Sequence, residues 1–237
     1  MIIDNSKKVL LVTGSSRGIG KFIAEYYCSR DFIVVGCSRG GASFNHQNYH
    51  HVCLDISIEK DILELFKYIR KDFKRLDILI NNAAINPAIL SSALLPYNTI
   101  ENVFKVNVFA AMLFCRESIK LMLRNKSGRI INMGSMAAKH EVAGEALYTS
   151  TKSALNTYTR VLAKEVSQMG ITVNVVAPAA IKTELSAKIN QVALREVLSR
   201  NAIQYFGEFA DVTNIIDFLV KTESNAITGQ IIYLGGA

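Results

Sequence analysis

The sequence predicts an α/β protein in which helices cover both faces of a parallel sheet, the doubly wound arrangement. Short runs of β-branched and aliphatic residues alternate with longer amphipathic segments along the 237 residues. Strands that are almost continuously apolar are typical of a parallel sheet buried on both faces. No Pro-, Gly- or Ser-rich linker and no internal repeat divides the chain, so we expect one domain spanning residues 1–237.

Seven segments have the composition of strands, and those between them have the apolar spacing of helices. The predicted strands are 8–13, 32–37, 50–54, 77–80, 129–133, 171–176 and 230–234. The predicted helices are 19–30, 58–73, 100–124, 146–168, 185–200 and 211–220. In helix 58–73 the apolar residues fall on one face, which we expect to pack on the sheet.

The charge and hydropathy of the chain exclude several classes of protein. The formal net charge is +7, but the basic residues are scattered and form no nucleic-acid motif, so we expect no nucleic-acid partner. A positive excess suits anionic small molecules such as a nucleotide. The apolar runs are shorter than the roughly 20 residues of a membrane span, and residues 1–8 lack the apolar stretch of a signal peptide. We therefore expect a cytoplasmic protein that does not contact a membrane.

The cysteines and histidines predict no metal site. None of the four cysteines is spaced for metal binding, and each lies in or beside an apolar segment, which predicts small buried thiols. They are Cys28, Cys37, Cys53 and Cys115. Three histidines, His46, His50 and His51, cluster in a polar segment without acidic neighbours, and a solvated loop is favoured there over a metal site.

A glycine-rich turn follows the first predicted strand and leads into a helix. Its sequence, T-G-S-S-R-G-I-G at positions 13–20, differs from the general G-x-G-x-x-G fingerprint. A tight turn, a close approach to phosphate and close helix packing each favour glycine, and a helix N-terminus attracts pyrophosphate. Dinucleotide binding is favoured over a purely structural turn. The expected contacts are Gly14, Ser16, Arg17, Gly18, Ile19 and Gly20.

The end of the second predicted strand indicates which dinucleotide is bound. An acidic residue there would bind the ribose 2′-hydroxyl of NAD, but residues 36–40 contain none. Ser38 and Arg39 lie there instead, and Arg39 together with Arg17 can bind a 2′-phosphate. NADP(H) is therefore favoured over NAD(H), with two merely exposed arginines as the alternative.

Tyr148 and Lys152 have the spacing of neighbours on one helix face. A nearby ammonium is expected to lower the pKa of the phenol from its reference of about 10, which suits a general acid/base. Ser135, at the end of an apolar run, can polarise the same substrate oxygen. Taken alone the spacing is common, and a solvent-exposed pair of neighbours on one helix face is the simpler explanation.

These residues together resemble the short-chain dehydrogenase/reductase family over essentially the whole chain. The matching segments are Thr13 to Gly20, Leu54-Asp55-Ile56, Asn81-Asn82-Ala83-Ala84, Asn107, Ser135, the Y-x-x-x-K pair at Tyr148 and Lys152, and Ile171 to Asn174. The resemblance implies a strand order of 3-2-1-4-5-6-7. The chain departs from the family pattern at Ala84 and at Pro178-Ala179, where glycines are usual.

The resemblance also implies roles for residues outside the turn and the Tyr/Lys pair. Asp55 and Ile56 would bind the adenine, and Asn82, Ala83 and Ala84 would line the nicotinamide site. Asn107 would belong to a proton relay with Lys152. Ile181 and Thr183 would contact the cofactor, Thr183 at the nicotinamide carboxamide. Within this relay Tyr148 is the expected general acid/base for hydride transfer between nicotinamide and a carbonyl or alcohol carbon.

The substrate is less well indicated. The pocket is expected from segments 85–87 and 136–144 and from a lid at 181–206, and their composition does not choose between an acyl thioester, a sugar and a polyol. The chain resembles the subgroup of 3-oxoacyl-(acyl-carrier-protein) reductases, which present basic residues to an acidic carrier protein. In this chain Lys126 and Arg129 would form part of that basic patch. Met169, where those enzymes often have a basic residue, weakens this assignment, and a sugar or small-ketone reductase or dehydrogenase of a biosynthetic cluster is equally well indicated.

Two alternative functions that do not involve this reaction are also considered. The oligomeric state of the protein is a separate question. A non-catalytic NADP-binding sensor or scaffold would keep the cofactor site without the chemistry, and an extended-type epimerase or dehydratase would need a longer chain. The resemblance implies a homotetramer, or else a homodimer, built on helices 100–124 and 146–168. Leu113, Phe114 and Leu121 suit either such an interface or the core.

Overall fold

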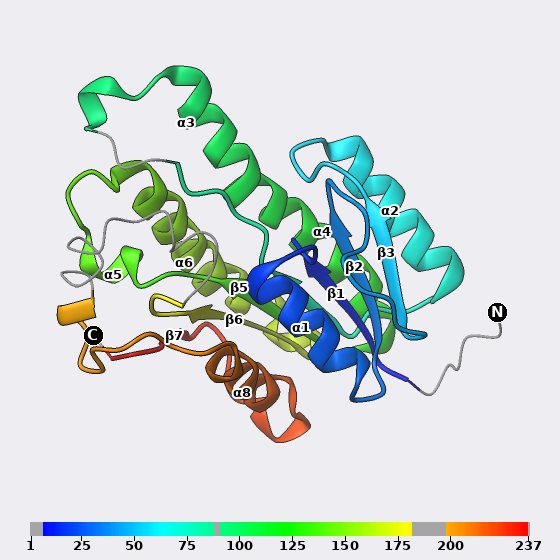
Figure 1. Ribbon diagram of the computed structural model, residues 1–237. Coiled ribbons are helices and arrows are strands. Elements are labelled where there is room, and N and C mark those ends of the chain that lie inside the picture. Colours follow the sequence, from blue (N-terminus) through cyan, green and yellow to red (C-terminus); the bar gives the residue numbers. More distant parts are fainter. Residues whose placement is uncertain (1–6, 88–90, 182–197, 237) are drawn as a thin grey trace.

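A seven-stranded parallel sheet lies at the centre of the computed structural model, which describes residues 7–87, 91–181 and 198–236 (Figure 1). Its order, β3-β2-β1-β4-β5-β6-β7, confirms the predicted fold class and strand order. The strands are β1 (Val9–Thr13), β2 (Ile33–Ser38), β3 (Tyr49–Cys53), β4 (Ile78–Asn81), β5 (Gly128–Met133), β6 (Ile171–Ala177) and β7 (Ile231–Tyr233). Every predicted strand is present.

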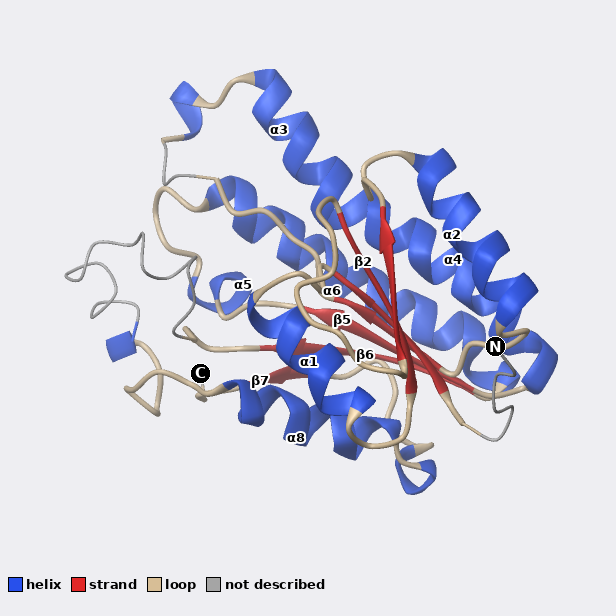
Figure 2. Cartoon of the chain, turned by 45° about the vertical axis from the view of Figure 1, so that its right-hand side comes forward, coloured by secondary structure: helices blue, strands red, loops and turns tan. Residues whose placement is uncertain are grey.

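Helices connect the strands and cover the sheet on both sides (Figure 2). They are α1 (Gly18–Cys28), α2 (Glu59–Asp72), α3 (Tyr97–Phe104), α4 (Ala110–Met122), α5 (Ala137–His140), α6 (Ala146–Val166) and α8 (Phe209–Val220), with short 3-10 turns such as η1 (Ser92–Leu94). The predicted helix 185–200 and the predicted lid 181–206 lie largely outside the described residues.

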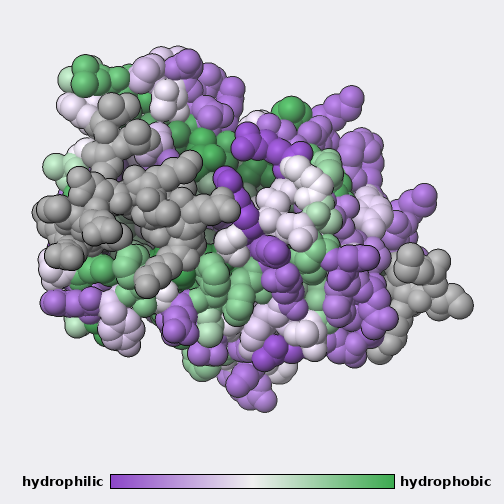
Figure 3. All heavy atoms as spheres, in the orientation of Figure 1, coloured by the Kyte–Doolittle hydropathy of each residue, from purple (hydrophilic) through white to green (hydrophobic). Residues whose placement is uncertain are grey.

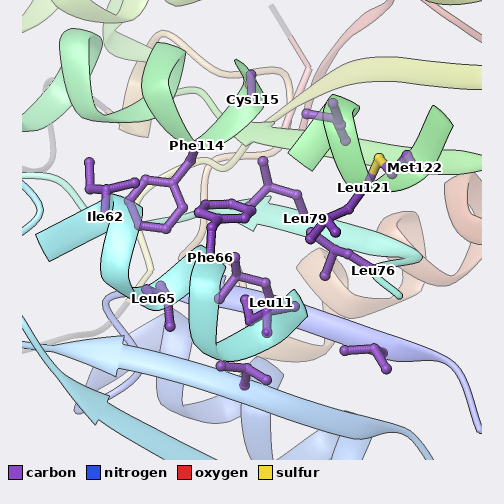
Figure 4. Packing of buried hydrophobic residues seen from close by; sticks show 14 of the residues in the cluster. Leu11, Ile62, Leu65, Phe66, Leu76, Leu79, Phe114, Cys115, Leu121 and Met122 are labelled. Atoms are coloured by element: carbon purple, nitrogen blue, oxygen red, sulfur yellow. The ribbon is translucent and has the colours of Figure 1, made fainter. Parts of the chain in front are cut away.

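Alternate residues of β1 face two separate cores. Val9 and Leu11 belong to the core beneath α2, α4 and α6, whereas Leu10 and Val12 belong to the core beneath α1 and α8. In the first core the rings of Phe66 and Phe114, from α2 and α4, meet edge to face with centroids 5.8 Å apart (Figure 4). This burial on both faces explains why the strand sequences are almost wholly apolar.

The predicted helix 100–124 is instead two helices joined by a π-helical turn, η2 (Lys105–Phe109). The backbone N–H of Ala110 donates to the carbonyl of Lys105, five residues earlier. Such a turn is often found at functional sites because it changes the direction in which side chains project. Here Asn107 lies at its centre and is buried.

Several predictions about single residues need correction. Cys28, Cys37 and Cys115 are buried as expected, but Cys53 is exposed, because it ends the edge strand β3, whose side chains are only partly covered. His50 and His51 lie within β3 rather than in a loop. Phe114 and Leu121 belong to the core. Within the described residues no cluster of His, Cys, Asp and Glu is arranged to hold a metal ion.

None of the helices in the described ranges combines the length and the hydropathy needed to cross a membrane.

Candidate active site

The turn after β1 and the loops after β4 and β5 meet at the carboxyl edge of the sheet, where open α/β sheets bind ligands (Figure 1). The glycine turn follows the predicted geometry. Gly14 and Gly18 have φ values of 72° and 56°, in the left-handed region that favours glycine. A Cβ on Gly20 would lie 2.3 Å from the carbonyl oxygen of Gly14, so α1 packs against the turn more closely than any side chain permits.

The N-terminus of α1 is suited to an anion. No side chain caps it and no acidic residue lies in its first turn, so its backbone N–H groups have no competing carboxylate. Ser16 and Ile19 are half-buried and Arg17 is exposed around this end. The tight glycine turn and the uncapped helix together fit the pyrophosphate of a dinucleotide.

Thr13 and Asn82 tie the turn to the loop after β4. The Thr13 hydroxyl accepts hydrogen bonds from the backbone N–H groups of Asn82 (3.0 Å) and Ala83 (2.9 Å). The Asn82 amide donates to the Thr13 carbonyl at 2.9 Å. Asn82 directly follows β4, which ends at Asn81, one residue later than predicted. Thr13 was not among the predicted site residues, although it opens the glycine motif.

The residues predicted to hold the adenosine lie around the ends of β2 and β3. The Asp55 carboxylate accepts bonds from the backbone N–H (2.9 Å) and hydroxyl (2.7 Å) of Ser57, which lower its pKa, and the nearby Arg39 acts in the same direction. Ile56 is half-buried and Arg39 is exposed. The Ser38 hydroxyl donates to the carbonyl of Gly40 at 2.9 Å.

A second polar chain at this end was missed from the sequence. His51 lies 3.1 Å from the Ser38 hydroxyl and 2.8 Å from the Tyr49 hydroxyl. Tyr49 in turn contacts the Ser15 hydroxyl, within the glycine turn, at 2.8 Å. Tyr49 and His51 are alternate residues of β3 and therefore share one face, a period-two signal that the sequence does contain.

Ser135, Tyr148 and Lys152 come together as predicted, from the end of β5 and the first turns of α6. The Tyr148 hydroxyl is hydrogen-bonded to Ser135. The Lys152 ammonium lies 5.6 Å from the centre of the Tyr148 ring and donates to the carbonyl of Met133 at 2.8 Å. Lys152 is buried, whereas Tyr148 and Ser135 are partly exposed.

The pKa of Tyr148 differs from the expectation. Burial raises it to about 12, Ser135 opposes this by its hydrogen bond, and the charge of Glu145 adds to the rise. Burial likewise lowers the pKa of Lys152 to about 8. The expected lowering of the tyrosine pKa by the ammonium is not found, because desolvation of the phenolate is the larger effect at this site.

Asn107 lies next to the trio but its side chain is fully engaged. Its amide oxygen accepts from the backbone N–H of Ile85 (2.8 Å), and its amide nitrogen donates to the Ile85 carbonyl (2.9 Å). The same nitrogen donates to the Thr151 hydroxyl at 3.1 Å, which itself donates to the Tyr148 carbonyl at 2.7 Å. Asn107 thus fixes the loop after β4 relative to the helix that carries Tyr148.

The remaining predicted cofactor residues are only partly placed. Ala84 is exposed and Ala83 half-buried at the edge of the sheet. Ile181 is buried in the core beneath α1 and α8, so only its backbone is available to a ligand. Thr183 lies outside the described residues.

Two hollows lie beside the loop after β4, and one of them reaches Tyr148. A cavity of about 380 Å³ lies between the loop after β4 and helix α3, lined by Ile85, Asn86, Pro87, Asn98, Thr99, Asn102 and Val103. A narrow crevice shares Asn86 and Pro87 with it and reaches Tyr148 and Glu145. Glu145 was not predicted from the sequence, although it lies only three residues before Tyr148.

Comparison with known proteins agrees with this geometry. Residues 8–193 match the family model described as short chain dehydrogenase. The 3-oxoacyl-(acyl-carrier-protein) reductases FabG of Buchnera aphidicola and Escherichia coli are 33% and 30% identical to the chain, covering 99% and 97% of it and 98% and 96% of their own lengths.

Two solved structures share the fold. One, "ElxO with NADP bound", has a TM-score of 0.88 and 29% identity, covering 96% of this chain and 97% of its own. A 4-hydroxyisoleucine dehydrogenase complexed with NADH has a TM-score of 0.87 and 27% identity, covering 97% and 98%. The chain belongs to the short-chain dehydrogenase family and is an NAD(P)-dependent oxidoreductase.

Proposed function

We propose that the protein interconverts a carbonyl compound and a secondary alcohol with NADP(H), using Tyr148 as the general acid/base. The observation that carries this proposal is the grouping of three side chains beside a dinucleotide turn: Tyr148 bonded to Ser135, with the Lys152 ammonium 5.6 Å from the phenol ring. A bound nicotinamide supplies the hydride to the carbonyl carbon or removes it from the alcohol.

Tyr148 donates the proton in the reductive direction. A pKa of about 12 keeps its hydroxyl protonated at neutral pH, so the acid is present when the carbonyl oxygen becomes negative. Ser135 polarises the same oxygen and stabilises the phenolate by a hydrogen bond. Lys152, with a pKa of about 8, is still a cation at neutral pH and would also hold the nicotinamide ribose.

The other assigned residues support these. Asn107 holds the loop after β4 against α6, and by resemblance it joins a proton path to Lys152. Asn82, Ala83 and Ala84 would line the nicotinamide. Asp55 and Ile56 would bind the adenine, and Thr183 the carboxamide.

The cofactor is proposed to be NADP(H) rather than NAD(H). The absence of an acidic residue at the end of β2 and the exposed Arg17 and Arg39 favour a 2′-phosphate. Of the two structural relatives, one carries NADP and the other NADH, so the family alone does not decide.

A 3-oxoacyl-(acyl-carrier-protein) reductase is the second candidate, because the similar FabG proteins bear that name. One feature expected of such a reductase, the contribution of Arg129 to a basic docking patch, is not supported. Arg129 is buried and donates to the Gly128 and Lys221 carbonyls and to the side chain of Asn225, so it cannot form part of a basic docking patch. Lys126 is exposed and remains available.

The test is turnover of a panel of ketones and secondary alcohols by wild-type protein and Tyr148→Phe, with NADPH and NADH in parallel. We expect Tyr148→Phe to lose at least about a thousandfold in kcat, the usual scale for a general acid in a concerted site, while its Kd for NADPH stays within a fewfold. A phenylalanine variant that turns over at the wild-type rate would show the assignment to be wrong. Binding of NADPH without turnover in the wild type would favour the sensor reading.

A further inference from the structure

Glu145 is a carboxyl group at the substrate end of the site that the proposed chemistry does not use. It precedes α6, is half-buried, and lines the narrow crevice together with Tyr148, Asn86 and Leu95. No described residue forms a hydrogen bond or an ion pair with its carboxyl oxygens. Because the group is only half-buried, its oxygens can accept a hydrogen bond from a ligand in the crevice.

The surroundings of Glu145 identify what is missing. Burial raises its pKa, and the charge of His140 opposes that rise, so the two side chains are close. His140 is already engaged, with its Nε2 2.7 Å from the Asn201 side-chain oxygen. The charge of Glu145 also raises the pKa of Tyr148. Glu145 lines the same narrow crevice as Tyr148 and is close enough for its charge to act on the reacting hydroxyl.

The adjoining cavity has a matching character. Its polar side chains are Asn86, Asn98, Thr99 and Asn102, all uncharged donors and acceptors. Among the described residues lining it there is no Lys, Arg or His to bind an anionic group. Asn98 and Asn102 are one helical turn apart on α3 and share a face. A ligand with several neutral hydroxyl groups suits these walls.

We propose that Glu145 is a substrate-positioning residue that accepts a hydrogen bond from a hydroxyl group next to the reacting carbonyl. The substrate class is then a neutral hydroxylated ketone, with further hydroxyl groups held by Asn98, Thr99 and Asn102. This inference rests on the proposed function and specifies its substrate. A plain alkyl ketone or acyl chain would leave the carboxyl group desolvated and unpaired, which a site built for hydrogen bonding discriminates against strongly.

The experiment compares two ketones of equal size, hydroxyacetone and butanone, in which a hydroxyl replaces a methyl group. Dihydroxyacetone, aminoacetone and an acetoacetyl thioester complete the panel. In wild-type protein we expect kcat/KM for hydroxyacetone to exceed that for butanone by about tenfold or more. In Glu145→Leu the ratio should fall toward one, and in Glu145→Gln, which keeps an acceptor oxygen, to an intermediate value. Glu223→Leu, which removes an exposed carboxylate that lines neither hollow, should keep the wild-type ratio.

Two further readouts separate positioning from a merely structural role. Calorimetric binding of propanediol to the enzyme with NADPH, a pair that cannot react, should weaken about tenfold in Glu145→Leu. In Glu145→Gln the basic limb of the kcat/KM profile should move to lower pH, because an anion no longer raises the pKa of Tyr148. The titratable groups facing Glu145 in the described structure are His140 and Tyr148, with Lys152 beyond the phenol ring.

The outcomes distinguish failure of this substrate inference from failure of the proposed oxidoreductase function. Turnover of butanone or the thioester as well as hydroxyacetone would overturn the inference while supporting the oxidoreductase reaction. A preference for aminoacetone would indicate that Glu145 binds an ammonium group rather than a hydroxyl group. That result would also overturn the inference. No turnover of any carbonyl with either cofactor would count against the proposed function itself.

Discussion

Tyr148 and Lys152 lie one helical turn apart, and at both residues burial competes with charge. An ammonium near a phenol was expected to make the phenol more acidic, and the spacing alone gives no other answer. The fold adds desolvation, an effect that the local sequence does not reveal, because α6 buries Lys152 beneath the end of β5. There the Lys152 ammonium donates a hydrogen bond to the Met133 carbonyl. The pKa of Tyr148 therefore rises and that of Lys152 falls.

The buried Lys152 makes stability depend on pH. Its folded pKa is about 8, against 10.5 for the ordinary group, so the unfolded chain holds more protons between these values. Stability is then lowered below about pH 8 and recovers as the pH rises to about 10.5. The full difference is roughly 3 kcal/mol, from a shift of two to three pKa units at about 1.4 kcal/mol each.

We therefore expect the wild-type protein to gain stability relative to Lys152→Met across this pH window. Urea unfolding of both proteins at intervals from pH 7 to pH 10.5 measures the difference between their free energies of unfolding. Loss of the hydrogen bond to Met133 changes this difference by a constant amount and therefore does not affect how it varies with pH. A difference that stays constant with pH would contradict the lowered pKa.

Among the elements, the helix predicted at 100–124 shows where sequence patterns stop being informative. Apolar spacing correctly predicts helical structure on both sides of Asn107, but not the π turn between them. That turn lets Asn107 bond the backbone of Ile85, a partner 22 residues away. A contact of this kind depends on tertiary structure, whereas the glycine turn was predictable because its demands are local. Glu145 was missed for the same reason as the π turn, whereas the period-two pattern of Tyr49 and His51 is local and present in the sequence.

Gly20, in the first turn of α1, and Gly40, just after β2, make a matched pair for substitution. We expect Gly20→Ala to lower the free energy of unfolding by about 1–3 kcal/mol, because its Cβ would meet the Gly14 carbonyl oxygen at 2.3 Å and the Asn82 amide at 2.4 Å. NADPH binding should weaken with it, since the turn must move. Gly40→Ala is the control, because nothing lies within 4 Å of its added Cβ. Equal effects of the two substitutions on denaturation midpoint would contradict this packing argument.

At the scale of the whole molecule, the two helical layers were predictable because most strands are apolar on both faces, whereas the strand order was predicted from the family resemblance. The assembly of copies is a different question, since Phe114 and Leu121, considered for an interface, are used in the core. Other apolar side chains, on α6 and in the turn before α4, are exposed instead. Phe109, in the π turn that leads into α4, is 51% exposed, and Val161 on α6 is 50% exposed.

We propose a homotetramer in which these helices meet their counterparts, with a homodimer as the alternative. Light scattering after gel filtration should give the wild-type protein a mass of four chains, and Val161→Glu about half that or less, because a carboxylate would be buried without a partner. Ile58→Glu is the control: Ile58 is similarly exposed, at 48%, but it precedes α2, on a side of the molecule where Figure 3 shows mostly hydrophilic residues. A wild-type mass of one chain would refute the assembly, and equal loss in both variants would place the interface elsewhere.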